Sequence, residues 1–302
     1  MFCAQLAQAE SSGILVITSS NADLYTRFTD SFEAKYTALT GTPGARINRI
    51  RLDGNSQPPG PIPTDTAVIV SVGAKTARTV AALELNTPVL YTLIPESTYK
   101  SLVPATASCA QQSAVFIDQP VTRQAWLAQA IFPQAESYGA LLGPTSSRHR
   151  ETLEAIASTA DWQLVIKEIT ADTDPEWQTR ELVDETDLII AISDPHALNR
   201  NNAKWLLYSA YQRQNPVIGF SRAYVKAGAA ASVYSTPEQI GKQTAELLGR
   251  FEKNNRNCLS TPEFPRYFKV KTNSDVIHSL GGMRKDETEL LKSLMEYEKV
   301  QQ

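Results

Sequence analysis

The sequence lacks the patterns that usually identify a catalytic or metal-binding protein. It holds only three cysteines and three histidines, and no CxxC pair or Cys/His cluster has the spacing of a metal site. The nucleophile pattern GxSxG is absent. Neither phosphate-binding pattern, GxGxxG after a strand or GxxxxGK[ST], occurs, although residues 73–76 look like the end of the second. We therefore expect no catalytic residue, no metal and no cofactor.

A basic excess and long apolar runs are missing as well. The net charge of -3 provides no surplus of cations to neutralise phosphates, so nucleic acid is not an expected partner. No stretch of about 18 apolar residues is present that would predict a membrane-spanning helix. Hydrophobic residues make up 42% and charged residues 20%, a globular composition, and 302 residues suit two domains of ordinary size.

The first residues, MFCAQLAQAE, contain the small-x-small pattern Ala7-Gln8-Ala9 at which a secretory signal is cleaved. We interpret residues 1–12 as a signal-peptide remnant or disordered start, with an ordinary frayed terminus as the alternative. If Cys3 leaves with the signal, Cys109 and Cys258 remain as an even pair. In an exported protein they either form a disulfide or stay as two free thiols, and the sequence leaves both open.

Short apolar runs rich in β-branched residues alternate with helical patterns along the chain, which predicts an α/β fold with buried parallel strands. Crossovers between parallel strands are right-handed, so each series of strand and helix forms one sheet flanked by helices. The expected fold is two Rossmann-like lobes. The strands of the first lobe are expected at 13–19, 47–52, 67–72, 88–93 and 113–117, and those of the second at 138–142, 163–169, 187–192 and 216–220.

The stretch 216–251 departs from this repeat, because it runs strand, loop, strand and helix rather than strand and helix. A passage of the chain from one lobe to the other explains that order. We expect three such crossings, near 118, 234 and 262. The expected domains are a first lobe of 13–118 plus 235–261, a second lobe of 119–234 plus 262–282, and a C-terminal helix at 283–302.

Small or polar residues recur where the apolar strands end, and open α/β sheets bind ligands at the carboxyl ends of their strands. For any one of these residues the simpler interpretation is a helix cap, but their placement in both lobes favours a small polar ligand. The predicted ligand-binding residues at these strand ends are Ser19, Ser20, Asn21, Gly73, Ala74, Thr145, Asp194, Phe220 and Ser221.

With these features the chain resembles the ABC-transporter substrate-binding proteins usually described as uncharacterised periplasmic components. The resemblance covers residues 13 to about 282 and is most specific in PVIGFSRAYVKAGAAASVYS, SVGAKTA, the strand end at Asp194 and YFKVKTNSDVIHSLG. It implies the type I periplasmic-binding-protein fold with three interlobe crossings. The family's Asp-Pro pair after the fourth strand is replaced by Ile94-Pro95-Glu96, in a loop that normally shapes the pocket, which adds Ile94 to the expected site.

The expected function is that of a periplasmic, non-enzymatic solute-binding protein of a bacterium. It would capture a small polar, amino-acid-like ligand between its lobes and deliver it to an ABC permease in the inner membrane, acting as a monomer. Asp194 would accept from a ligand ammonium group, Ser19, Ser20 and Thr145 would donate to a carboxylate or carbonyl, and Gly73 would let the backbone approach. Replacing Asp194 by alanine would then weaken binding and leave stability nearly unchanged.

Several points stay open on the sequence alone. The aromatic residues that either stack on a ligand ring or belong to the core are Tyr91, Phe116, Phe220 and Tyr224. A ligand sensor of the same fold that acts on a membrane receptor or kinase is one alternative function. An α/β enzyme is the other, for which Asp194 and Glu96 offer only a weak acid-base pair.

Overall fold

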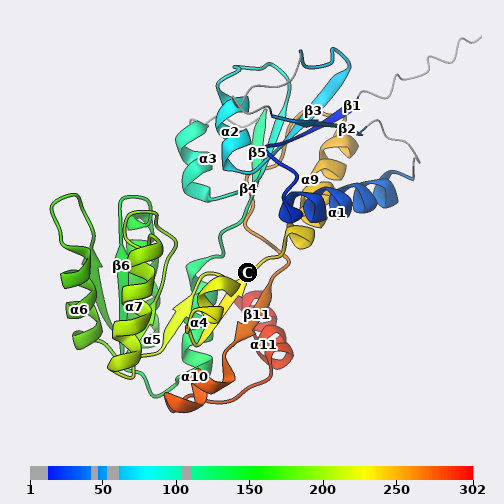
Figure 1. The fold of residues 1–302 in the computed structure, drawn as a ribbon. Coiled ribbons are helices and arrows are strands. Elements are labelled where there is room, and N and C mark those ends of the chain that lie inside the picture. The colour runs from blue at the N-terminus through cyan, green and yellow to red at the C-terminus, as the bar shows by residue number, and fades with distance from the viewer. Residues whose placement is uncertain (1–12, 42–46, 53–60, 104–110, 302) are drawn as a thin grey trace, which may run out of the picture. The chain divides into compact units, whose positions relative to one another are not determined.

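The computed structural model describes residues 13–41, 47–52, 61–103 and 111–301 and divides the chain into two compact units (Figure 1). Unit 1 comprises 1–117 and 236–267, and unit 2 comprises 118–235 and 268–302. The chain therefore crosses three times, after Ile117, Ser235 and Tyr267. The third crossing lies beyond the expected position near 262. Glu263 explains the difference, because its backbone pairs with Ala114 and Phe116 beside the edge strand and keeps the chain in unit 1.

Unit 1 holds a five-stranded parallel sheet in the order β2-β1-β3-β4-β5. Its strands are β1 (Gly13–Thr18), β2 (Ile47–Arg51), β3 (Thr66–Val72), β4 (Val89–Ile94) and β5 (Gln112–Phe116). The inner strands β1, β3 and β4 are buried along nearly their whole length, as their continuous apolar runs predict, whereas the edge strand β2 is partly exposed.

Helices cover both faces of this sheet (Figure 1). On one face α1 (Asp23–Thr40) and α9 (Pro237–Lys253) bury Phe28, Phe32 and Leu247 against alternate residues of β1 and β3. On the other face lie α2 (Ala74–Ala81) and α3 (Glu96–Leu102). The two helices α1 and α9 approach so closely that a Cβ at Gly241 would lie 2.5 Å from the carbonyl oxygen of Phe28.

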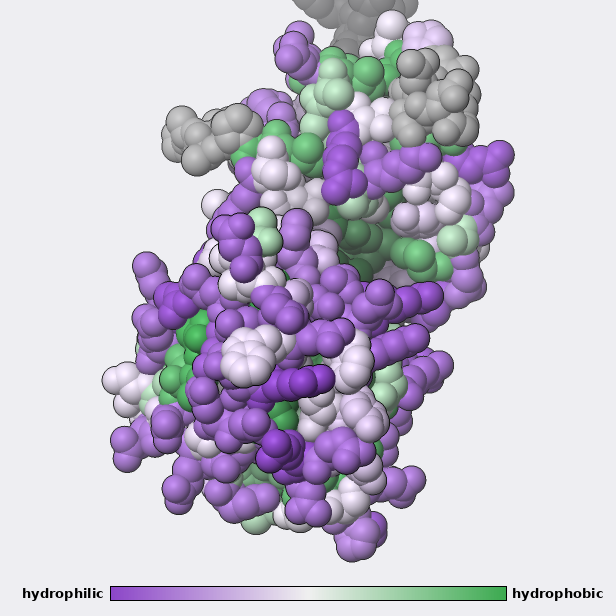
Figure 2. All heavy atoms as spheres, turned by 60° about the vertical axis from the view of Figure 1, so that its left-hand side comes forward, coloured by the Kyte–Doolittle hydropathy of each residue, from purple (hydrophilic) through white to green (hydrophobic). Residues whose placement is uncertain are grey.

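Unit 2 holds a six-stranded sheet in the order β11-β10-β9-β8-β6-β7. Its strands are β6 (Ser137–Leu142), β7 (Gln163–Glu168), β8 (Leu188–Ile190), β9 (Val217–Gly219), β10 (Ala231–Tyr234) and β11 (Lys269–Thr272). All neighbours are parallel except β10 and β11, which are antiparallel. The face of unit 2 that is turned to the viewer in Figure 2 is mostly hydrophilic, with small apolar patches.

The helices of unit 2 also form two layers. One face of the sheet packs against α4 (Val121–Ile131), α5 (Arg150–Ala160), α10 (Ser274–Ser279) and α11 (Glu287–Gln301). The other face packs against α6 (Pro175–Glu185), α7 (Arg200–Gln212) and α8 (Arg222–Lys226). The C-terminal helix, expected as a separate element, belongs to this core, because Leu290 and Leu294 are buried in it.

Two helices of unit 2 depart from the sequence pattern. The pattern over residues 196–213 favours one helix, but α7 starts at Arg200, where the side chain of Asn199 accepts from the backbone of Asn201 and Asn202. The preceding residues form a separate turn. The short helix α8 was also not predicted; Ser221 caps it by accepting from the Tyr224 backbone.

The described residues include no helix long and apolar enough to cross a membrane. Cys258 is disulfide-bonded. Cys109, with which the sequence allowed a pair, lies outside the described residues, as do Cys3 and the signal-like segment 1–12.

Candidate functional site

Each sheet has one point at which successive strands are added on opposite sides, and such switch points are where open α/β sheets form ligand crevices. In unit 1 this point lies between β1 and β3, and in unit 2 between β6 and β8. The polar residues that the sequence predicted as ligand contacts follow these strands. Unit 1 contributes residues 19–21 and 73–74 at its switch point, and unit 2 contributes Thr145 and Asp194 at its own.

At the switch point of unit 1 the hydroxyl of Tyr25 lies between the two strand ends. Ser19 Oγ donates to Tyr25 Oη at 3.2 Å. Gly73 has φ +89 and begins the turn into α2, and a Cβ there would stand 2.8 Å from Tyr25 Oη. A side chain at position 73 would therefore meet both backbone strain and the tyrosine ring. The sequence predicted Gly73 and Ser19 but missed Tyr25, whose helical spacing gave no sign of a role at the strand end.

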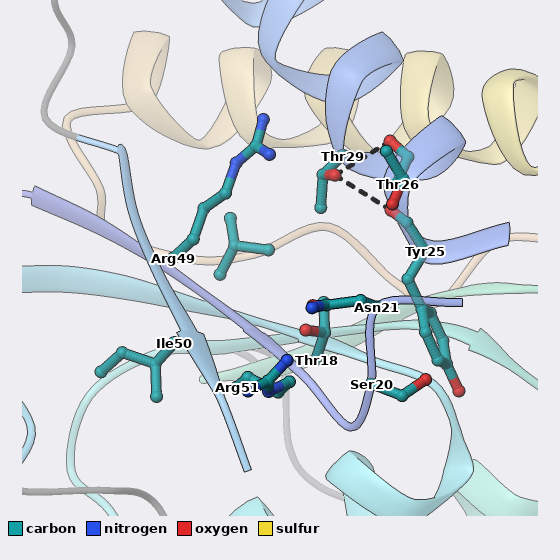
Figure 3. Close-up of a pocket in the computed structure, with 10 residues that line it drawn as sticks. Thr18, Ser20, Asn21, Tyr25, Thr26, Thr29, Arg49, Ile50 and Arg51 are labelled. Carbon is teal, nitrogen blue, oxygen red and sulfur yellow. Dashed lines mark hydrogen bonds between the residues drawn. The ribbon is translucent and has the colours of Figure 1, made fainter. Parts of the chain in front are cut away.

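A polar pocket of about 210 Å³ opens beside this point, between α1 and the strands β1 and β2 (Figure 3). Its lining is rich in hydroxyl, amide and guanidinium groups; the residues are Val16, Thr18, Ser20, Asn21, Tyr25, Thr26, Thr29, Arg49, Ile50 and Arg51. The proton of the Thr29 hydroxyl is shared between the carbonyl oxygens of Tyr25 and Thr26, so this hydroxyl does not donate into the pocket. Ser20 and Asn21, both predicted, are the strand-end residues that reach this pocket.

The two arginines of the pocket differ in their partners. Arg49 is neutralised by Glu33 at 2.5 Å and by Asp30 at 3.3 Å, and its pKa is raised mainly by the hydrogen bond to Glu33. Arg51 is exposed and has no ion-pair partner among the residues that the structure describes. The pocket therefore suits an anionic group such as a carboxylate, for which Arg51 offers a planar pair of donors.

At the switch point of unit 2 the carboxylate of Asp194 is the centre of a dense set of hydrogen bonds. Oδ2 accepts from the backbone and hydroxyl groups of Thr145 at 2.9 and 2.8 Å and from those of Ser146, each at 2.9 Å. Oδ1 accepts from the backbone of His196 at 2.8 Å and of Ala197 at 3.1 Å. A carboxylate has about four lone-pair sites, so these six donors leave none for a ligand.

This arrangement does not support the expectation that Asp194 accepts from a ligand ammonium group. Its residue is only 2% exposed. Burial by itself would raise the pKa of the Asp194 carboxyl, but the hydrogen bonds from Ala197, Thr145, His196 and Ser146 outweigh it and hold this pKa below its usual value. Asp194 ties the loop after β6 to the turn after β8, and it positions Thr145 rather than contacting solvent.

Asp187 forms a matching tie at the opposite ends of the same strands. Its Oδ2 accepts from the backbone of Glu136 and from the backbone and hydroxyl of Ser137, at 3.1, 2.9 and 2.7 Å. The Ser137 hydroxyl bond is the largest cause of the lowered pKa of Asp187. One carboxylate thus joins β6 to β8 at each end.

Among the other predicted contacts, Ile94 is in the core. It is 0% exposed and pairs with Phe116 across a strand irregularity at Leu93, which has φ 52 and turns the Ile94 side chain inward. Tyr91 and Phe116 are also buried, and both pack against Tyr99. These aromatic residues stabilise unit 1.

The strand end at β9 is more open. Phe220 is half-buried and packs on Tyr224 with ring centroids 4.5 Å apart, and Ser221 is half-buried as the cap of α8. The Tyr224 hydroxyl is buried without a hydrogen-bond partner in the described part of the chain, and burial raises its pKa. Ala74 is half-buried against the α2 face of the unit 1 sheet.

The weak acid-base pair of the enzyme alternative is not available for catalysis. Asp194 is saturated, and Glu96 pairs with Lys100 at 2.8 Å. Within the described residues no group of three or more His, Cys, Asp or Glu side chains is arranged to hold a metal ion.

Comparison with known proteins gives one family match. The model of the family described as ABC transporter substrate binding protein matches residues 62–253. A search of curated proteins finds no match.

Solved structures of low sequence identity share the fold. An ABC domain in complex with L-Trp from Streptococcus pneumonia has a TM-score of 0.61 at 15% identity, covering 93% of this chain and 97% of that one. A ligand-free, open substrate-binding protein with adhesive properties from Clostridium difficile has a TM-score of 0.68 at 16% identity, covering 91% and 96%. A conserved domain protein from Vibrio cholerae has a TM-score of 0.61 at 18% identity, covering 94% and 98%. Both lobes are thus of the type I periplasmic-binding-protein architecture, as the sequence predicted.

Proposed function

Since the chain belongs to the ABC transporter substrate-binding protein family, a family of non-enzymatic binding proteins, we propose that it binds a small amino-acid-like ligand and delivers it to an ABC importer. The ligand is held by side chains at the carboxyl ends of the strands in both units. An ABC permease of the inner membrane is the partner, the protein works as a monomer, and the periplasm is its location. These finer points rest on the family.

The observation that carries the ligand class is the polar pocket beside the unit 1 switch point. Arg51 is a cation without an ion-pair partner in the described residues, and the pocket it lines also holds Ser20 and Asn21. A carboxylate accepts from donors of these kinds, and a bidentate arginine contact adds geometric selection for it. The L-Trp complex of the Streptococcus protein makes free amino acids the first ligands to test.

In unit 2 the half-buried residues Thr145 and Ser221 and the exposed Ser193 are the groups left to contact a ligand. Asp194 acts indirectly by fixing Thr145 and Ser146. The ligand's amino group therefore meets hydroxyl and carbonyl acceptors in unit 2, and not the carboxylate of Asp194.

Native mass spectrometry of freshly purified protein, followed by calorimetric titration with the free amino acids, tests this proposal. We expect a copurified or titrated amino acid to bind, and Arg51→Ala to weaken it about tenfold or more, as loss of a charged hydrogen-bond donor does. The matched control is Arg78→Ala, an exposed arginine on α2 outside the pocket. Failure of every free amino acid to bind, or chemical turnover of the bound compound, would reject the proposal.

A further inference from the structure

One buried arginine in unit 2 contacts two of the three segments that connect the two units directly, and the remaining one through a glutamine. Arg123, on α4, is 6% exposed. The chain enters or leaves unit 2 after Ile117, Ser235 and Tyr267, so Gln119, Ser235 and Phe268 lie at these three points on the unit 2 side. This arrangement is not predictable from the sequence, because an arginine in an amphipathic helix is usually exposed.

The contacts are direct or pass through one side chain. Arg123 Nη1 donates to Gln119 Oε1 at 2.7 Å, and Gln119 Nε2 donates to Ser235 Oγ at 2.9 Å. The guanidinium carbon stands 3.8 Å from the centre of the Phe268 ring, a cation–π distance. The first, second and third crossings are therefore joined in one cluster, which we call the crossing cluster: Gln119, Arg123, Ser235 and Phe268.

The C-terminal helix supplies the charge that keeps Arg123 in place. Glu298 of α11 accepts from Nε at 2.6 Å and from Nη2 at 3.0 Å, a bidentate pair. A buried cation is stable only with such a partner, and removing the partner leaves an uncompensated charge that has to move toward water. If Arg123 moves, it releases Gln119 and Phe268 together.

On the unit 1 side each of the same three segments has contacts of its own. The Ile117 backbone donates to Ile94, Thr236 forms a capping box with Gln239, and the Tyr267 hydroxyl donates to Glu246. The unit 2 ends, in contrast, share the guanidinium of Arg123 and, through it, the carboxylate of Glu298.

We propose that Arg123 is a positioning residue for the hinge, and that Glu298 makes the C-terminal helix a lock on it. The proposal rests on the proposed function, in which the two units rotate when the ligand is captured. A few residues at the ends of helices and strands absorb rotations of this kind, so the connecting segments have to move. The lock limits how far the three segments vary independently and so restricts the range of unit orientations in the ligand-free protein.

The chain offers a matched control at the other end of the same helix. Glu287 accepts from Lys271 Nζ at 2.8 Å and from the backbone and hydroxyl of Thr272 at 2.9 and 3.1 Å. Glu287→Gln therefore weakens the attachment of α11 without touching the crossing cluster, whereas Glu298→Gln removes the charge opposite Arg123.

Hydrogen exchange of the intact, ligand-free protein measures the first effect. In Glu298→Gln we expect the backbone amides around Gln119 and Ser235 to exchange about tenfold faster, because local opening becomes easier. Arg123→Lys, which keeps the charge but loses the planar fork, should give the same pattern if Glu298→Gln folds poorly. Glu287→Gln should leave both regions unchanged.

A second readout separates hinge control from simple helix attachment. Spin labels on non-natural side chains at the exposed positions Arg78 in unit 1 and Lys204 in unit 2 report the distance distribution between the units. We expect a broader distribution in Glu298→Gln and Arg123→Lys than in wild type or Glu287→Gln. Unchanged exchange, equal effects of Glu287→Gln, or faster exchange with an unchanged distribution would each overturn the proposal. No ligand is used, so these outcomes are independent of which compound, if any, the protein binds.

Discussion

Replacing Asp194 by asparagine tests whether this residue is a structural tie or a ligand contact. Asparagine keeps the shape of the side chain but exchanges one acceptor oxygen for an amide that donates. In the least costly orientation its oxygen faces Thr145 and Ser146, and its amide faces the backbone N–H groups of His196 and Ala197. Two hydrogen bonds are then lost even in the best case.

The cost follows from counting these bonds. A hydrogen bond to a charged group contributes about 1.5–3 kcal/mol, so the loss of two lowers the free energy of unfolding of unit 2 by about 3–6 kcal/mol. With an m-value of about 2 kcal/mol per molar urea, the unfolding midpoint falls by roughly 1.5–3 M. A ligand contact exposed to solvent would leave the midpoint nearly unchanged.

Tryptophan fluorescence during urea unfolding is a selective assay, because all four tryptophans, Trp126, Trp162, Trp177 and Trp205, lie in unit 2. Asp187→Asn is the matched control. Its three donors all meet one oxygen, so asparagine can keep them and loses only charge assistance, about 1 kcal/mol. Equal midpoints for the two variants, or a loss below about 1 kcal/mol for Asp194→Asn, would refute the counting argument.

The pH dependence gives an independent check of the same reasoning. The folded-state pKa of Asp194 lies below the ordinary value, so its stabilising contribution is complete above the unfolded-state pKa of about 3.9 and is lost as the pH falls through the folded-state pKa. The difference in unfolding free energy between wild type and Asp194→Asn should be constant from pH 7 to about 5 and shrink below about 4. A difference that grows on acidification would contradict the assigned hydrogen bonds.

Three further predictions concern the close contacts of two glycines and the disulfide bond of Cys258. Gly73→Ala should lower the free energy of unfolding of unit 1 by about 1–3 kcal/mol. Adding Tyr25→Phe to this variant should recover only the part of the loss that comes from the clash with the tyrosine hydroxyl, because the positive φ at position 73 remains. Calorimetry of the two single variants and of the double variant checks this. Gly143→Ala would place a Cβ 2.5 Å from Asp194 Oδ1 and should lower the urea midpoint seen by tryptophan fluorescence, at a cost of about 1–3 kcal/mol. Cys258→Ser should lower the calorimetric stability of unit 1 by about 2–4 kcal/mol, and reduction of the wild-type protein should reproduce that loss.

The sequence predicted the layers of this fold well because buried parallel strands have a strong signature. Runs such as residues 13–19 and 67–72 are continuous, β-branched and bounded by polar or glycine residues, and the structure places strands there. The second crossing was readable from an interruption of the strand–helix order in residues 216–251. The third was not, because the pairing of Glu263 beside β5 is an isolated bridge without a periodic pattern.

Site chemistry was less predictable, because the state of a polar side chain depends on neighbours distant in sequence. Asp194 was recognised as the one carboxylate at a strand end, but its saturation requires Thr145 and Ser146, about fifty residues earlier in the chain. Ile94 was placed at the pocket from the family resemblance, but the irregularity at Leu93 lies next to it and its side chain is in the core. Arg123 gave no signal at all, since its burial depends on α11 at the far end of the sequence.

The two switch points therefore have different physical character, and that difference bears on how a ligand is selected. In unit 2 a saturated carboxylate at Asp194 fixes both strand ends, and rearranging it would break several charge-assisted bonds at once. In unit 1, among the described residues, the side-chain contact at the equivalent point is a hydrogen bond of 3.2 Å between Ser19 and Tyr25, next to Gly73 and beside an open polar pocket. Because the weaker contacts rearrange at lower cost, we expect differences in ligand preference among variants to arise mainly from Tyr25, Arg51 and their neighbours in unit 1. Substitutions at Ser146 or Asp194 should instead lower the stability of unit 2. They should reduce ligand affinity only to the extent that they unfold unit 2.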